Sequence, residues 1–213
     1  MLKGYQHIIW DWNGTLFNDL AFCVTIVNGM LARRGLPTIT LEQYRAVFTF
    51  PIRTYYQTLG FDLYQESFET LSQEFMAAYE AQRHACTLYP DARAVLEHVM
   101  ASGRRQSLLS AYAQETLITL VHTCNLGHCF AHLMGLDNIY AHSKVEQGRR
   151  LLAALPYSPA EILLVGDTLH DAEVAEAMGT ACVLVAHGHQ AKERLQQSGV
   201  PVVDALQELY MLI

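Results

Sequence analysis

The chain has 213 residues, of which 51% are hydrophobic and 16% are charged. This composition predicts a substantial buried core and excludes an intrinsically disordered chain. The net charge of −7, without a Lys/Arg-rich face, would repel nucleic-acid phosphates, so we expect no nucleic-acid partner. A small anionic substrate would then need a locally positive pocket, which a bound metal ion could supply.

Cysteine content and hydropathy predict the compartment. The five cysteines are an odd number without a C-x-x-C motif, which disfavours a disulfide framework and favours a reducing environment. The first apolar run, HIIW, is too short for a signal peptide, and no apolar stretch approaches membrane-spanning length. We therefore expect a soluble, cytoplasmic protein with no membrane partner.

Short apolar runs alternate with helical segments along most of the chain. Runs of strand length occur at residues 7–11, 106–110, 132–136, 161–167 and 181–186. Helices are predicted at 91–102, at 143–156, where Ser143 and Glu146 form a capping box, and at 170–179. The alternation predicts an α/β fold, with a Rossmann-like parallel sheet and helices on both faces.

Residues 17–88 interrupt this alternation, because they contain helical patterns and no convincing strand. The expected helices cover residues 20–34, 40–48, 51–60 and 63–84. We predict an all-helical cap domain, residues 17–88, inserted into a core domain of residues 1–16 and 89–213. The cap would lie above the carboxyl ends of the strands, where parallel α/β sheets hold their sites.

Polar side chains end three of the predicted strands. Asp11 ends the first strand, Ser110 the second and Asp167 the fourth, with Asp171 four residues further on. These ends converge on one crevice, where two acids and a backbone carbonyl would form an oxygen site suited to Mg²⁺. Asp11 could then attack a phosphate, and Lys144 could add positive charge.

Hydrogen-bond donors near the crevice could hold phosphoryl oxygens. The candidates are the Ser110 hydroxyl and the amides that follow Asp11 and Ser110, which belong to Trp12 and Ala111. Taken singly, Ser110 also suits a helix cap and Lys144 a solvated helix start. The order of all these residues along the chain favours the functional interpretation.

Four motifs carry a resemblance to a known family. They are IIWDWNGTL (8–16), SLLSA (107–111), Lys144 within HSKVEQG, and LLVGDTLHDAEVAEAMG (163–179). In this order they resemble the haloacid dehalogenase-like (HAD) hydrolase superfamily, and within it the phosphoglycolate phosphatase and β-phosphoglucomutase-like branch. The resemblance covers almost the whole chain.

The resemblance implies a role for each matching position. Asp11 would be the nucleophile that forms an aspartyl-phosphate, and Lys144 would stabilise it and the transferring phosphate. Ser110 would bind the phosphoryl group. Asp167 would ligate Mg²⁺, and Asp171 would ligate it or orient its waters and Lys144. The backbone carbonyl of residue 13 would be a further metal ligand.

Asn13 departs from the family pattern. Its phosphatases have an Asp here that protonates the leaving oxygen and then activates water, whereas an amide cannot shuttle that proton. General acid–base catalysis is typically worth about 10²–10⁴ in rate. Asn13 therefore predicts a slow phosphatase, one restricted to good leaving groups, or one with another proton shuttle. The resemblance disfavours phosphonate cleavage, because that reaction needs a cap lysine and residues 17–88 contain none. It also disfavours dehalogenation, because dehalogenases need no Mg²⁺ whereas Asp167 and Asp171 would form a metal site.

We therefore expect a Mg²⁺-dependent phosphatase that hydrolyses a small phosphorylated metabolite, with a catalytically weak phosphate-ester-binding protein as the alternative. Arg53, in the cap, could bind a substrate carboxylate or second phosphate, or be a surface helix residue. His187 and His189 belong to a loop at the mouth of the site and could shuttle protons. The cluster of His122, Cys124, His128, Cys129 and His132 fits no standard zinc spacing.

Overall fold

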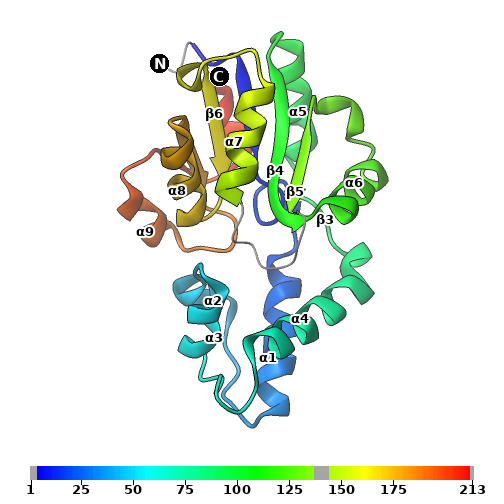
Figure 1. Ribbon diagram of the computed structural model, residues 1–213, viewed down its shortest axis with the longest axis vertical. Helices are drawn as coiled ribbons and strands as arrows, with labels where there is room; N and C mark the ends of the chain where they lie inside the picture. Colours follow the sequence, from blue (N-terminus) through cyan, green and yellow to red (C-terminus); the bar gives the residue numbers. More distant parts are fainter. Residues whose placement is uncertain (1–3, 137–143, 212–213) are drawn as a thin grey trace.

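The computed structural model describes residues 4–136 and 144–211. Its centre is a six-stranded parallel sheet with the strand order β5-β4-β1-β6-β7-β8. The strands are β1 His7–Trp10, β4 Arg105–Ala113, β5 Leu133–Leu136, β6 Ile162–Gly166, β7 Ala181–Val185 and β8 Val202–Val203. The predicted Rossmann-like α/β fold is confirmed, and its strands alternate in sequence with helices (Figure 1).

Helices cover both faces of this sheet because each central strand is apolar on both sides. In β1, Ile8 and Trp10 pack into one hydrophobic cluster and Ile9 into the other. The first cluster includes residues of α5 Ala92–Ala101, α6 Gln114–Thr123 and the 3₁₀ helix Leu206–Met211. The second includes residues of α7 Lys144–Ala154, α8 Leu169–Met178 and α9 Lys192–Leu195. Continuous apolar strands of this kind are typical of buried parallel sheets.

Four helices between β1 and α5 lie apart from the sheet, beyond one of its ends (Figure 1). They are α1 Leu20–Arg33, α2 Leu41–Val47, α3 Ile52–Thr58 and α4 Phe68–Gln82. The capping box of Thr40 and Gln43 forms as the sequence predicts. The fourth helix begins only after Ser67, which caps it by accepting a hydrogen bond from the Thr70 amide, so its predicted start at residue 63 is wrong.

The expectation of no strand within residues 17–88 is also wrong. Phe17–Asn18 (β2) pairs antiparallel with Thr87–Leu88 (β3) in a two-stranded sheet. Two residues are too few to show an alternating pattern, so no sequence signal marks them. This sheet joins the chain entering the four helices to the chain leaving them. The predicted capping box at Ser143 lies outside the described residues.

The strand order reverses at β1, which pairs with β4 on one side and β6 on the other. Such a switch point opens a crevice at the carboxyl ends of the strands. The crevice lies at the end of the sheet that faces α1–α4. In the parts of the chain that the structure describes, no helix has the length and apolarity needed to cross a membrane.

We predict that His7 makes stability depend on pH. Burial in β1 lowers the pKa of His7 to about 4, so the folded protein keeps the ring neutral while the unfolded chain protonates it near 6.5. As pH falls from 6.5 towards 4, the unfolded state binds more protons and the free energy of unfolding falls. The expected loss is on the order of 2 kcal/mol.

Urea unfolding at pH 7 and pH 5 checks this prediction. His7→Gln keeps a hydrogen-bonding group for Ser107 Oγ, which lies 2.9 Å from His7 Nε2, but removes the titration. The variant should lose clearly less stability than the wild type between the two pH values. Equal losses would contradict the prediction.

Candidate active site

Asp11 lies at the carboxyl end of β1, at the switch point of the sheet. Its backbone amide donates to the Val165 carbonyl at 2.8 Å, which continues the pairing with β6 just past the strand. Its side chain is buried, with 8% of the residue exposed. The neighbouring strands thereby fix the direction in which the carboxylate projects.

Lys144 links two carboxylates that come from opposite ends of the chain. Its ammonium Nζ donates to Asp11 Oδ1 and to Asp171 Oδ1, both at 2.6 Å. Burial disfavours the charged amine, but Asp11 and Asp171 outweigh it, so the pKa of Lys144 is raised and the side chain stays protonated. The first residue of α7 is therefore joined to β1 and α8 by one buried cation.

Asp167 follows β6, and two glycine-containing loops pack closely against its carboxylate. Its Oδ1 accepts from Thr15 Oγ1 at 3.1 Å, and its Oδ2 accepts from the His189 amide at 2.6 Å. A Cβ at Gly188 would lie 2.1 Å from Asp167 Oδ2, and one at Gly14, where φ is +73°, would lie 2.2 Å away. Only glycine therefore lets both loops approach this carboxylate so closely.

Asp11, Asp167 and Asp171 offer carboxylate oxygens that lie within 4.8 Å of one another. All three side chains are buried and come from three separate segments. Hard oxygen donors at this spacing fit a divalent cation such as Mg²⁺. The three acids that sequence analysis named as metal ligands thus lie close together.

The charges around these three carboxylates also favour a bound cation. Among the described residues, four buried carboxylates, those of Asp11, Asp19, Asp167 and Asp171, face Lys144 and His189. Burial raises the pKa of Asp11 to about 7 and that of Asp167 to about 6, since neighbouring carboxylates add to the cost of ionisation. A divalent cation would balance the excess negative charge and favour the ionised form of both acids.

Asp19, which the sequence analysis missed, is the centre of a buried hydrogen-bond network. Its Oδ1 lies 3.2 Å from His189 Nε2 and accepts from the Gly14 amide. Its Oδ2 accepts from the Tyr79 hydroxyl at 2.7 Å and from Asn13 Nδ2 at 2.8 Å. Burial opposes its charge, but His189 and the hydrogen-bond donors lower the pKa of Asp19, so it remains a carboxylate.

His189 forms an ion pair with Asp19 inside the protein. Burial disfavours the charged ring, but Asp19 raises the pKa of His189 to about 9, so the ring is an imidazolium at neutral pH. Its Nδ1 lies 3.0 Å from the Tyr44 hydroxyl of α2, which can accept from it. The His189–Asp19 pair therefore joins the loop after β7 to the residue before α1, and the Tyr44 contact joins the same loop to α2.

The same network fixes the orientation of Asn13. Its Nδ2 donates to Asp19 Oδ2 and to the Tyr79 hydroxyl, each at 2.8 Å. Because an ionised carboxylate can only accept, the amide nitrogen must face Asp19. Both hydrogens of the amide are used, so the group that Asn13 can still offer to the cavity is its carbonyl oxygen Oδ1.

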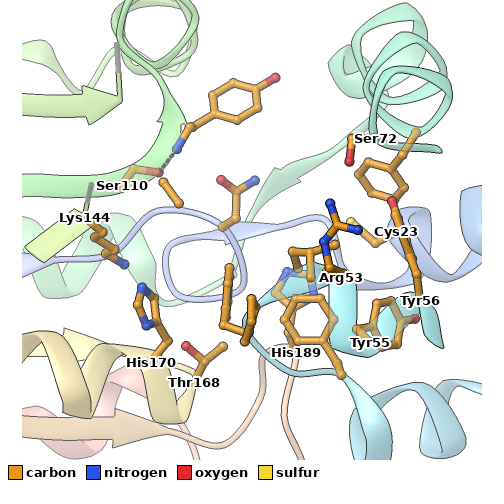
Figure 2. A pocket seen from close by; sticks show the side chains of 18 of the residues that line it. Cys23, Arg53, Tyr55, Tyr56, Ser72, Ser110, Lys144, Thr168, His170 and His189 are labelled. Atoms are coloured by element: carbon orange, nitrogen blue, oxygen red, sulfur yellow. Dashed lines mark hydrogen bonds between the residues drawn. The ribbon is translucent and has the colours of Figure 1, made fainter. Parts of the chain in front are cut away.

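A cavity of about 720 Å³ lies above these residues, lined by residues of the sheet ends and of α1–α4. Figure 2 shows Ser110, Lys144, Thr168 and His170 on one side of it and Arg53, Tyr55, Tyr56 and Ser72 on the other. A ligand in the cavity would therefore contact residues from both parts of the chain.

The predicted substrate-binding residues differ in how they lie relative to the cavity. Ser110 and Ala111 line the cavity, and Ser110 Oγ accepts a hydrogen bond from the Tyr112 amide at 3.1 Å. The Trp12 side chain is fully buried and stacks on Phe17, so any contact with a phosphate would come from its backbone. Arg53 lines the cavity 3.6 Å from Glu69, with both side chains about half exposed.

The network around Asp19 had weak signals in the sequence. Asp19 precedes the first residue of α1 and suggests a helix cap, although its side chain makes no capping hydrogen bond. Tyr79 lies in a long amphipathic helix, where an aromatic residue indicates packing. Of the residues in this network, Asn13 and His189 were considered as site residues from the sequence. Within the described residues, no three side chains of the 122–132 His/Cys cluster meet to hold an ion.

Comparisons with known proteins agree with this architecture. A Pseudomonas savastanoi phosphoglycolate phosphatase is 27% identical over 95% of this chain and 77% of its own length. A Pseudomonas putida N-acetylmuramic acid 6-phosphate phosphatase is 26% identical over 85% of this chain and 83% of its own. A solved haloacid dehalogenase-like hydrolase from Streptococcus pneumoniae superposes with a TM-score of 0.82 at 18% identity, covering 97% of both chains.

The family model described as haloacid dehalogenase-like hydrolase matches residues 8–185, a span that contains Asp11, Lys144, Asp167 and Asp171. The chain therefore belongs to the haloacid dehalogenase-like hydrolases, and it is similar to the phosphoglycolate phosphatases among them.

Proposed function

We propose that this protein is a Mg²⁺-dependent phosphatase that hydrolyses a small phosphate monoester through an aspartyl-phosphate at Asp11. The observation that carries the proposal is the buried cluster of Asp11, Asp167 and Asp171 with Lys144 between two of its members. The relatives named as phosphatases support the reaction class. The free state of all five cysteines supports a cytoplasmic location.

Asp11 has one carboxylate oxygen available for attack on phosphorus. Its Oδ1 accepts from Lys144, which leaves Oδ2 as the nucleophile. In the first step the Asp11 O–P bond forms and the bond from phosphorus to the leaving oxygen breaks. The leaving oxygen keeps the bonding electron pair and takes a proton from solvent. In the second step a water oxygen attacks phosphorus, the Asp11 O–P bond breaks, and the water proton leaves with phosphate or solvent. The products are an alcohol and inorganic phosphate.

Bound Mg²⁺ would neutralise charge on the phosphoryl group. The ion would be held by the side chains of Asp11, Asp167 and Asp171 and by the backbone carbonyl of Asn13. Lys144 holds Asp11 in position for attack and adds positive charge to the phosphoryl site. Ser110 and the backbone amides of Trp12 and Ala111 would donate to the phosphoryl oxygens. The developing negative charge is thus stabilised mainly by preorganised donors.

Residues 17–88 would act as the cap domain over the core of residues 1–16 and 89–213. The four helices contribute much of the cavity lining, so they would exclude water from the first step and select the substrate. Arg53, on α3, is the residue we assign to contact the part of the substrate that lies in the cap.

The alternative is a protein that binds phosphate esters in this pocket without turning them over, and Asn13 is the observation that favours it. Both hydrogens of its amide are donated to Asp19 and Tyr79. It can therefore neither protonate a leaving oxygen nor accept a proton from water. Measuring phosphate release distinguishes a slow phosphatase from a protein that binds esters without hydrolysing them.

Asp11→Asn is expected to reduce Mg²⁺-dependent phosphate release by at least about 10³-fold, since it removes the nucleophile. The measurement is steady-state release of inorganic phosphate across a panel of phosphate esters. Asp204→Asn, which changes an exposed carboxylate, is the matched control and should keep full activity. Tight binding of an ester without any release from the wild type would favour the binding protein.

Mg²⁺ is expected to raise the melting temperature relative to a chelator-treated sample. A ligand at 100 times its Kd stabilises by about 2.7 kcal/mol, which corresponds to roughly 5–10 °C for a chain of this size. Asp167→Asn should abolish most of this rise, because it removes a charged ligand from the cluster. Scanning calorimetry with and without Mg²⁺ checks it. An unchanged rise in the variant would show that the ion binds elsewhere.

Asn13→Asp is expected to raise turnover of esters with poor leaving groups, by about 10-fold or more, since it introduces a proton shuttle. In the wild-type network, however, the new carboxylate would face Asp19 across a 2.8 Å contact. The double variant Asn13→Asp/Asp19→Asn exchanges amide and carboxylate and keeps a donor between them. It should show the larger gain in kcat. A fall in kcat for both variants would mean that the Asn13 amide serves the chemistry directly.

A further inference from the structure

The part of the cavity above the reacting groups is predominantly apolar. Its volume of about 720 Å³ is well above what a phosphoryl group occupies and falls in the range of sites for whole small-molecule ligands. The apolar lining includes Phe48, Phe50, Ile52, Phe68, Phe75 and Met76. Apolar lining of this kind gains free energy by burying an apolar ligand surface, and each buried CH₂ is worth about fourfold in affinity.

Among the described residues, the cap side of the cavity has one cation, Arg53, and a carboxylate lies beside it. Arg53 and Glu69 are charged residues in this part of the lining, and they lie 3.6 Å apart. The Arg53 guanidinium also lies over the Phe68 ring, 4.7 Å from its centroid. A carboxylate such as that of glycolate would have to compete with Glu69 for this arginine. The charge pattern therefore favours an ester whose organic part carries no carboxylate or second phosphate.

The reacting end of the cavity has few groups that could protonate a leaving oxygen. In the described residues, Asp19, Lys144, Asp167, Asp171 and His189 all line this end and are all engaged in hydrogen bonds. His170 lies on the same side of the cavity, and its Nδ1 contacts Glu173 while its Nε2 has no partner within the described part of the chain (Figure 2). Asn13 donates both of its amide hydrogens, to Asp19 and Tyr79, so neither is free for a leaving oxygen. Hydrogen-bond geometry therefore favours an ester whose leaving oxygen departs without a proton.

An ester whose oxygen is attached to an aromatic ring meets both conditions: the ring carries no anionic group, and its oxygen can leave without a proton. A phenol has a pKa of about 10, whereas an aliphatic alcohol is, like water, a weaker acid by several units. A phenolate can thus leave without a proton donor. At the boundary between the two parts of the lining, Phe50 stacks on His170 with centroids 4.8 Å apart, so planar groups already pack here.

Resting on the proposed phosphatase function, we infer that the substrate is an aryl phosphate. Its phosphoryl group would lie at Asp11, and its apolar ring would lie against the aromatic residues of α3 and α4. This assigns the leaving-group class from the lining of the cavity and from the orientation of Asn13.

A panel of four esters with Mg²⁺ tests the inference: phenyl phosphate, 2-naphthyl phosphate, cyclohexyl phosphate and 2-phosphoglycolate. Phenyl and cyclohexyl phosphate are similar in size and apolarity but differ in leaving-group acidity. We expect kcat for phenyl phosphate to exceed that for cyclohexyl phosphate by at least 100-fold. We expect kcat/KM for both aryl esters to exceed that for phosphoglycolate by at least 10-fold, with the lower KM for 2-naphthyl phosphate.

Glu69→Gln tests the charge argument by a gain of activity, which a folding defect cannot imitate. The variant leaves Arg53 without its carboxylate neighbour, so the ratio of kcat/KM for phosphoglycolate to kcat/KM for phenyl phosphate should rise about two- to fivefold. Glu146→Gln, which alters an exposed carboxylate on α7 outside the cavity lining, is the matched control and should change neither.

The source of the aryl phosphate is identified by adding a short phosphotyrosyl peptide to the panel. Hydrolysis of the peptide together with phenyl phosphate supports an aryl phosphate carried on a polypeptide. Hydrolysis of the small aryl esters alone supports a free metabolite. Both results support the aryl assignment.

Three results would overturn the inference. A higher kcat/KM for phosphoglycolate than for either aryl ester would overturn it while leaving the phosphatase function intact. Similar kcat for phenyl and cyclohexyl phosphate would reveal a proton donor, for example His170, whose Nε2 has no partner among the described residues, and would remove the leaving-group argument. No Asp11-dependent phosphate release from any ester would overturn both proposals.

Discussion

The contact of the Lys144 ammonium with Asp11 and Asp171 is the constraint on which the rest of the site depends. A buried carboxylate is costly unless it is paired, and here one cation serves two carboxylates from distant parts of the chain. The pairing ties the start of α7 to the end of β1 and to the first turn of α8. Asp167 is then placed beside them by the backbone of the loop after β7. Removal of Lys144 would leave both carboxylates without the cation that they share.

Asp19 forms a second buried centre that joins the sheet to the helices beyond it. Its carboxylate receives hydrogen bonds from the Asn13 loop, from Tyr79 of α4 and from His189 of the loop after β7. Asp19 therefore connects the loop after β1 and the loop after β7 with helix α4 through hydrogen bonds. This arrangement also explains why an amide can occupy position 13, since a carboxylate there would face Asp19 directly.

Residues of both buried centres line the same cavity. One end holds acids and a buried lysine, as a phosphoryl site requires, and the other is lined by aromatic and aliphatic side chains. The pairing of Arg53 with Glu69 keeps the apolar end close to neutral. Relatives of this chain carry names of phosphatases with small, polar substrates. A difference in cavity lining is the physical route by which one fold comes to serve different esters.

The sequence by itself determined the sheet and the positions of the acids that follow its strands. Apolar runs followed by Asp11 and Asp167 predicted parallel strands with acids at their carboxyl ends, because strand length and burial leave a local pattern in the chain. Only the tertiary structure decided what surrounds those acids. The two-residue strands β2 and β3, the hydrogen bonds of Asp19 and the orientation of Asn13 depend on contacts between residues as many as 170 positions apart. Such contacts leave no local periodicity, and the choice of substrate depends on them.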